Sequence, residues 1–437
     1  MNIQRSFAVL SALLLLLGCS PEKTEIPSSA NPVKQHNIRA FNRDEISAGD
    51  KTIAITGATL IDGNGGETLP DAVVLIENDR IKWVGKADEY SAPAGVEVMD
   101  ATGLFLLPGL MDAHYHLNDP NDFLLRGVTS IRDPGAWNES YDPVRAKGQP
   151  LPRLFLTGPH LDMYPPAYPN NSFLVRDAAE ARVAVNKFAD QGATAIKVYF
   201  RLSLGIIQAI CETAHARDIP VVAHLEITHA GDAIEAGLDG IEHITSFGTA
   251  LLPMQQAEKY KQLILADNAA RDRGRYEVWN SLDLENNPQV DTLLKAILKH
   301  KTVISPTLAV FERQYDQGDS IEVNGFQNML TFLGMAHRAG ARIVVGSHTW
   351  APYGEGFAYA REMELLVKAG MSNAEVIVAA TMENARYFQV EDRLGSIEAG
   401  KQADLILLKE NPLEDIRAIR SIERVMLNGV WISVPER

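Results

Sequence analysis

Apolar and polar positions alternate in short runs near both ends of the chain. The N-terminal runs cover residues 53–55, 72–76 and 81–85, and the C-terminal runs cover residues 403–408 and 424–432. Short, closely spaced runs separated by Gly, Asn and Asp are typical of β-strands, and the Asn428-Gly429 pair is typical of a hairpin turn. We therefore expect the two ends to pair into one small β-sandwich.

The middle of the chain alternates between apolar runs that predict strands and longer helical patterns. The helical patterns include residues 178–191 and 204–217, and the predicted strands are residues 110–114, 128–131, 154–156, 195–199, 221–224, 240–243, 303–305 and 343–346. Eight such strand–helix units predict a (β/α)8 TIM barrel, whose chemistry lies at the C-terminal ends of its strands. The connection between His243 and Val303 is longer than an ordinary loop, and its helical pattern makes it a candidate lid.

The first twenty residues have the pattern of a targeting segment. Arg5 precedes an apolar run at residues 7–17, which is too short to span a bilayer, and the run ends at Gly18-Cys19. This ending resembles a bacterial lipoprotein cleavage box, in which Cys19 is lipidated and becomes the first mature residue; the alternative is a plain signal peptide with an incidental cysteine. A polar tether follows. We expect an extracytoplasmic protein that is lipid-anchored to a bacterial membrane.

These patterns divide the chain into five predicted parts. They are a signal peptide (1–18), the lipidated cysteine and its tether (19–50), the first part of the β-sandwich (51–106), the barrel (107–390) with an insertion at about 248–300, and the second part of the β-sandwich (391–437).

Composition narrows the class of protein. With 46% hydrophobic residues the chain can form a packed core, and a formal charge of −15 without clustered Lys or Arg argues against nucleic acid as a partner. We expect a small-molecule substrate and contact with a membrane through the lipid anchor only; the sequence does not decide whether the protein is a homo-oligomer. Cys211, in an apolar helical pattern, is expected to be a buried thiol.

Histidines gather at the predicted strand ends. His114 and His116 are two positions apart, so on a strand they share a face, and His224 and His243 each end a strand of their own. Lys197 and Tyr199 lie near the end of another strand. Imidazoles that converge in one site favour Zn²⁺ or a similar divalent ion, so we expect a metal site.

Several short segments give the chain a specific resemblance to the amidohydrolase superfamily, near its imidazolonepropionase-like and prolidase-like members. They are Leu107–Pro108–Gly109–Leu110–Met111–Asp112–Ala113–His114–Tyr115–His116, Lys197-Val198-Tyr199, Ala223-His224, Glu242-His243, and residues 384–385 with 395–404. The resemblance implies that Lys197 is carboxylated and bridges two metal ions. One ion would be bound by His114, His116 and Lys197, and the other by Lys197, His224 and His243. Two alternatives for Lys197 are a Schiff-base lysine and a salt-bridged structural lysine.

The chain departs from this family at the eighth strand, where an aspartate is expected and His348 stands instead. His348 can replace the aspartate as proton shuttle or ligand, since imidazole is a competent base near neutral pH. The site can instead have changed its metal number and activity, or the domain can be a pseudoenzyme. Glu355, seven residues further on, is the nearest carboxylate.

The remaining candidates carry weaker expectations. His160 and Tyr199 are candidate substrate contacts, and Asp112 is expected to support the histidines. His229 and His337 are expected at the surface. Arg271, Arg273 and Arg275 can clamp a substrate carboxylate, although a solvated charged helix is the favoured interpretation.

The sequence therefore predicts a metal-dependent hydrolase of amide-type C–N bonds that uses a metal-bound hydroxide, with one or two divalent ions per chain, zinc being favoured. Its substrate would be a dipeptide, an N-acyl amino acid or a cyclic amide. The alternative is a non-catalytic or altered-activity substrate-binding lipoprotein on the same barrel.

Overall fold

The computed structural model describes residues 39–91, 95–313, 319–349 and 357–433. The predicted signal peptide, Cys19, most of the tether and Glu355 lie outside these ranges. Within them, none of the helices has the length and apolar character that crossing a membrane requires.

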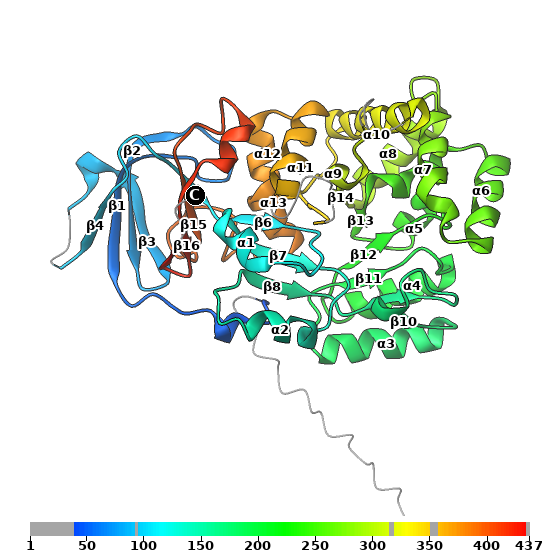
Figure 1. Cartoon of the computed structure of the whole chain (residues 1–437), viewed down its shortest axis with the longest axis horizontal. Coiled ribbons are helices and arrows are strands. Elements are labelled where there is room, and N and C mark those ends of the chain that lie inside the picture. Colours follow the sequence, from blue (N-terminus) through cyan, green and yellow to red (C-terminus); the bar gives the residue numbers. More distant parts are fainter. Residues whose placement is uncertain (1–38, 92–94, 314–318, 350–356, 434–437) are drawn as a thin grey trace, which may run out of the picture. The chain divides into compact units, whose positions relative to one another are not determined.

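Strands from both ends of the chain form one mixed sheet of eight strands, with the order β17-β16-β15-β5-β1-β2-β3 and β4 paired to β1 (Figure 1). Their bounds are β1 (Thr52–Leu60), β2 (Leu69–Glu77), β3 (Arg80–Lys86), β4 (Glu97–Asp100), β5 (Phe105–Pro108), β15 (Leu405–Leu408), β16 (Ile422–Leu427) and β17 (Val430–Ile432). The predicted pairing of the two chain ends is confirmed. The expected sandwich is instead one hydrogen-bonded sheet, because β5 pairs with both β1 and β15.

The middle of the chain forms two parallel sheets. One has the order β6-β7-β8 and the other β10-β9-β11-β12-β13-β14. Their bounds are β6 (Leu110–Asp112), β7 (Val128–Asp133), β8 (Arg153–Leu156), β9 (His160–Asp162), β10 (Ser172–Leu174), β11 (Ile196–Val198), β12 (Val221–His224), β13 (Gly240–Glu242) and β14 (Val303–Ser305). All pairs within these two sheets are parallel, as in a TIM-barrel-like α/β fold.

The predicted eighth strand is reduced to a single bridge between Ile304 and Ile343. Backbone hydrogen bonds nevertheless run from Val344 N to Ile304 O (3.0 Å) and from Ala113 N to Val345 O (2.9 Å). This segment therefore lies between β14 and the residues that follow β6, which is the place that an eighth strand would take.

Helices lie between most of the parallel strands (Figure 1). The α-helices are α1 (Pro120–Leu125), α2 (Asp142–Arg145), α3 (Ala178–Asp190), α4 (Leu204–His215), α5 (Ala230–Glu235), α6 (Met254–Ala266), α7 (Ala270–Asn280), α8 (Pro288–His300), α9 (Leu308–Phe311), α10 (Ser320–Ala339), α11 (Phe357–Lys368), α12 (Asn373–Ala380) and α13 (Met382–Tyr387). Shorter 3-10 helices are η1 (Arg43–Glu45), η2 (Ala87–Glu89), η3 (Asn138–Tyr141), η4 (Pro169–Asn171), η5 (Ile244–Leu251) and η6 (Ile416–Arg420). The predicted helices at 178–191 and 204–217 are confirmed, and the long connection after His243 is helical as expected.

Two residues of the family-like segment at 384–385 and 395–404 form hydrogen bonds to the parallel-strand region. Asn384 Nδ2 donates to the carbonyl oxygens of Met111 (2.6 Å) and Val345 (3.0 Å). Asp404 accepts from Arg153 Nε (2.7 Å) and Nη2 (3.0 Å), and both side chains are buried. The first contact holds the start and the end of the parallel strand series together. Asn384 and Asp404 of this segment thus have structural contacts.

Candidate metal centre

One cavity of about 580 Å³ collects the predicted site residues. Its lining includes His114, His116, His160, Lys197, Tyr199, His224, His243 and His348. Most of these side chains lie at or just beyond the C-terminal ends of parallel strands, which meet at one edge of a sheet. The structure therefore brings together every site residue that the sequence predicts within the described ranges.

His114 and His116 lie just beyond β6, which ends at Asp112. The expected strand geometry therefore stops two residues early, yet both imidazoles reach the cavity, with 3.2 Å between the two Nε2 atoms. Asp112 accepts hydrogen bonds from His114 N (3.0 Å) and Ser347 N (2.9 Å). Asp112 thus supports the backbone that carries His114 and does not contact the imidazoles through a hydrogen bond.

A carboxylate lies behind each of these two imidazoles. His114 Nδ1 makes a short contact with Glu242 Oε2, and His116 Nδ1 lies 3.9 Å from Asp133 Oδ1. Glu242 also accepts from Tyr387 Oη (3.2 Å), and Asp133 from Tyr141 Oη (2.9 Å). The carboxylate on Nδ1 of His114 fixes the tautomer whose Nε2 carries a free lone pair, which is the usual arrangement behind a metal-binding histidine. Asp133 is too far from His116 for a direct hydrogen bond.

Sequence reasoning assigned no role to Glu242 or Asp133. Asp133 is the last residue of β7, so its position at a strand end was the available signal. Glu242 directly precedes His243, and no local sequence pattern predicts that the Glu242 side chain reaches His114.

Substitution of Glu242 by glutamine tests this support. The amide leaves the shape intact but removes the negative charge and replaces one of the two acceptor oxygens, which serve His114 and Tyr387, by an NH2 donor. We therefore expect metal affinity to fall about 10–100-fold, as for other supporting carboxylates. The measurement is competition for the metal against a chelator. Glu235→Gln is the matched control, because Glu235 is exposed and pairs with Lys299. Equal metal affinity in the two variants would contradict the assigned role.

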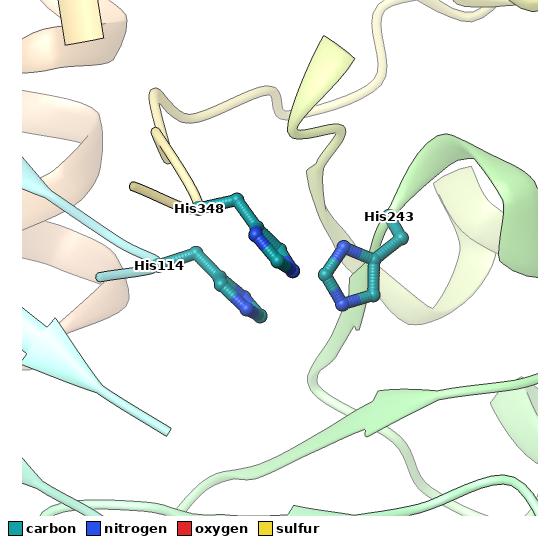
Figure 2. Close-up of side chains that lie close together, drawn as sticks. All are labelled: His114, His243 and His348. Atoms are coloured by element: carbon teal, nitrogen blue, oxygen red, sulfur yellow. The ribbon is translucent and has the colours of Figure 1, made fainter. Parts of the chain in front are cut away.

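His114, His243 and His348 form a group that could hold a metal ion, with one ligand nitrogen from each within 4.8 Å of the others. Figure 2 shows the rings of His114 and His348 lying parallel, with His243 facing them from the opposite side. The ring centroids of His114 and His348 are 5.2 Å apart, and that of His243 lies 4.5 Å from His114. His348 thus lies within the group of candidate ligands, at the position where the resemblance expected an aspartate.

His243 and His224 are fixed by polar neighbours. His243 Nδ1 lies 2.7 Å from Thr307 Oγ1, and His224 Nε2 lies 3.2 Å from Glu226 Oε1. The ring centroids of the two histidines are 4.5 Å apart. His224 therefore already has a carboxylate on Nε2, which leaves its Nδ1 as the second candidate ligand atom.

The backbone at the site is strained. His243, Thr307, His348 and Thr349 have φ values of 65°, 48°, 63° and 68°. β-branched and bulky residues rarely adopt the left-handed region, and such strain clusters at functional sites. Surrounding contacts such as the hydrogen bond from His348 N to His114 O (2.6 Å) hold these positions.

Lys197 is a buried amine without a hydrogen-bond partner among the described residues. It is 1% exposed, and burial lowers the pKa of its ammonium to about 8. The desolvation cost of a buried ammonium disfavours its charged form. An unpaired, weakly basic amine in a histidine-lined cavity fits a site in which a further group completes its interactions.

Burial also keeps the imidazoles neutral. It lowers the pKa of His114, His224, His243 and His348 well below the usual value, and the pKa of His116 to about 4. Neutral imidazoles have lone pairs to donate, whereas imidazolium ions do not. Together with the unpaired Lys197 amine, this donor set suits a borderline divalent cation such as Zn²⁺.

The arginines of α7 correct one sequence-based expectation. Arg271 is 6% exposed and, with Arg275, lines the cavity, so the interpretation as a solvated charged helix is wrong for this face of α7. Their i,i+4 spacing places them on one side of the helix, while Arg273 faces outward and pairs with Asp319 (2.8 Å).

The other predicted side chains lie as follows. His160 begins β9 instead of ending a strand, and its ring stacks on Tyr199 with 4.6 Å between centroids. His229 is exposed and His337 is partly exposed in α10, both outside the cavity as expected. Cys211 is buried, and burial raises the pKa of its thiol to about 12.

Comparison with known proteins identifies the family. The model of the amidohydrolase family matches residues 105–432, which is most of the chain. The chain belongs to the amidohydrolase family. The superfamily resemblance drawn from the sequence is confirmed.

The individual relatives of this amidohydrolase match it either over a short segment or at low sequence identity. A dihydroorotase of Geobacter sulfurreducens is 46% identical over 70 residues, which is 16% of this chain and 15% of the relative. A solved structure of a putative prolidase from Bifidobacterium longum is 28% identical and covers 89% of this chain and 97% of its own, with a TM-score of 0.68. A Xaa-Pro dipeptidase structure, 20% identical over 87% of this chain and 99% of its own, shares the fold with a TM-score of 0.67.

Proposed function

We propose that this amidohydrolase is a metal-dependent hydrolase of amide-type C–N bonds. The observation that carries the proposal is the gathering of neutral imidazoles and one unpaired buried amine, Lys197, in a single cavity. The proposal includes closure of the parallel strands into a (β/α)8 barrel, with residues 343–346 as the eighth strand.

One or two divalent ions, zinc being favoured, would be held by the ligand set that the resemblance implies. That set is His114, His116 and Lys197 for one ion, and Lys197, His224 and His243 for the other. His348, which has a nitrogen within 4.8 Å of ligand nitrogens of His114 and His243, is available as a further ligand. Zinc accepts imidazole nitrogen and carboxylate-type oxygen readily, so the donor set suits it.

Carboxylation of Lys197 is part of this proposal. An ammonium beside divalent cations would be repelled, whereas a carbamate supplies negative charge and oxygen ligands. The neutral amine is the form that reacts with carbon dioxide, and the pKa of about 8 makes that form accessible near neutral pH. The bond formed joins Nζ to the carbon of carbon dioxide, and one amine proton is released to solvent.

Proton transfer and substrate binding would fall to side chains of the protein itself. A bound divalent metal supplies Lewis acidity and lowers the pKa of water. His348 would accept the proton from the attacking water and return it to the leaving nitrogen, since Nδ1 of His348 has no other partner among the described residues. Tyr199 and His160, stacked on each other at the cavity wall, would contact the substrate.

A second candidate function rests on His348 itself. Replacement of the family's aspartate by a neutral imidazole removes a negative charge from the site, and a protein that binds but does not turn over the same ligands is the alternative.

A screen for hydrolysis separates the two functions. Purified protein is tested on dipeptides, N-acyl amino acids, lactams and lactones, before and after chelation and after return of zinc. The proposal expects hydrolysis of at least one amide class, lost on chelation and restored by metal. Binding of amides without any turnover, in protein that holds metal, would favour the alternative function.

The location of the protein is a further proposal that rests on the sequence of residues 1–20. Acylation of Cys19 would anchor the protein to the membrane, so Cys19→Ser is expected to move it from the membrane fraction to the soluble extracytoplasmic fraction. Fractionation followed by immunodetection measures this, with the wild-type protein as reference. A Cys19→Ser variant that stays with membranes would show that the anchor lies elsewhere.

A further inference from the structure

Arg271 is a buried cation that forms no direct ion pair within the described part of the chain; the carboxylate of Glu226 acts on it only from a longer distance and is paired with Arg275. Nη1 donates to Tyr199 Oη (3.1 Å) and Nη2 to Tyr168 Oη (2.8 Å). The guanidinium carbon lies 5.3 Å from the ring centre of Tyr168 and 5.1 Å from that of Phe200. The neighbours of Arg271 are thus hydroxyl groups and aromatic rings.

Arg275, one helical turn further along α7, differs from Arg271 in its pairing. Its Nη2 lies 3.3 Å from Glu226 Oε1, the carboxylate oxygen that also faces His224. Arg273, on the outer side of α7, pairs with Asp319 and Glu277. Among the three arginines, only Arg271 has no carboxylate oxygen within 4 Å in the described residues.

A buried charge is costly unless a counter-charge compensates for its desolvation. A guanidinium has five N–H donors, and two tyrosine hydroxyls use only part of them. The planar fork matches a carboxylate, which it can bind through two parallel hydrogen bonds. An anion in the cavity would therefore complete the interactions of Arg271.

The cavity places such an anion close to the candidate metal centre. The ring of Tyr199 stands between the two, because its hydroxyl bonds Arg271 and its centroid lies 4.7 Å from that of His224. A group bound at Arg271 is thus about one aromatic ring away from the histidines. This separation suits a carboxylate only a few bonds from the reacting amide.

We propose that Arg271 binds a carboxylate of the substrate, so that this amidohydrolase acts on amides carrying an acidic group near the scissile bond, as N-acyl amino acids and dipeptides do. The inference rests on the proposed function for the reaction itself. Its binding component is independent of turnover and is tested separately.

The test compares acid and carboxamide forms of one molecule. N-acetyl-L-methionine and L-alanyl-L-proline, each with its C-terminal amide, are titrated calorimetrically into metal-containing wild-type protein, Arg271→Gln, Arg271→Lys and the control Arg273→Gln. A hydrogen bond to a charged group is worth about 10–100-fold in affinity. We expect wild type and Arg273→Gln to prefer the acid by that factor, Arg271→Gln to lose the preference while binding the carboxamide as before, and Arg271→Lys to keep part of it.

The outcomes separate three explanations. If Arg271 only positions Tyr168 and Tyr199, Arg271→Gln lowers the affinity for acid and carboxamide equally, and the inference is overturned. If the wild-type protein binds neither form of either pair, or binds both equally, the inference is also overturned. An acid preference that depends on Arg271 without any hydrolysis would support the binding site and count against the proposed reaction. Thermal melting of each variant confirms that it is folded.

Discussion

Replacement of Lys197 by alanine is expected to remove both bound metal and activity. Lys197 would supply ligand oxygens to both ions as a carbamate, so its loss affects the whole centre at once. Residues that only support ligands are worth about 10–100-fold in metal affinity, and loss of a bridging ligand is expected to exceed that. A short-chain carboxylic acid such as acetate or propionate, placed in the space left by the side chain, should restore part of both.

Metal content and turnover are measured with and without the added acid. Lys299→Ala is the matched control, because Lys299 is exposed and pairs with Glu235. Mass spectrometry of the metal-loaded wild-type protein provides a direct check for carbon dioxide added to Lys197. An unmodified amine in that protein, or full metal content in Lys197→Ala, would contradict the bridging role.

Replacement of His348 by alanine is expected to lower kcat by about 10²–10⁴-fold, the range typical of general acid–base catalysis. KM should change less, because proton transfer occurs in the chemical step and not in binding. His348→Asp restores the residue type that the family resemblance expects and should retain activity. Unchanged kcat in His348→Ala with unchanged metal content would remove His348 from the mechanism.

The pH dependence follows from the environment of His348. Burial, with smaller effects from His116, His114 and Lys197, lowers its pKa well below the usual value. A lowered pKa keeps the imidazole neutral, and therefore able to accept a proton, below about pH 6.5. The acid limb of the kcat profile should thus lie below that pH in the wild type and move in His348→Asp, because carboxylates and imidazoles differ in intrinsic pKa.

Much of the site could be predicted because its chemistry lies in short, regular segments. His224 ends β12 and His243 directly follows β13. The expectation that site residues lie at the C-terminal ends of parallel strands therefore placed both correctly. The sequence correctly predicted that His114 and His116 lie in the site, but the predicted reason was only partly right. Strand alternation put both on one face, whereas β6 ends at Asp112 and the backbone contacts of Asp112 and Val345 hold the segment beyond it.

What could not be predicted depends on contacts between residues far apart in the sequence. The short contact between Glu242 and His114 joins the end of β13 to the segment that follows β6, in a different sheet, and no local sequence pattern encodes it. Arg271 lies in a strongly charged segment whose composition predicts a solvent-exposed helix. Only the tertiary packing of α7 buries one face of that helix. The single sheet formed by both chain ends likewise depends on β5 pairing with β15 across most of the chain.

The metal content of the purified wild-type protein tests the central claim most directly. Protein prepared without chelator from zinc-supplemented cells is analysed by elemental analysis, with its folding checked by thermal melting. The account predicts one or two divalent ions per folded chain, lost together with hydrolytic activity on chelation. A folded protein that holds no stoichiometric metal under these conditions would contradict it.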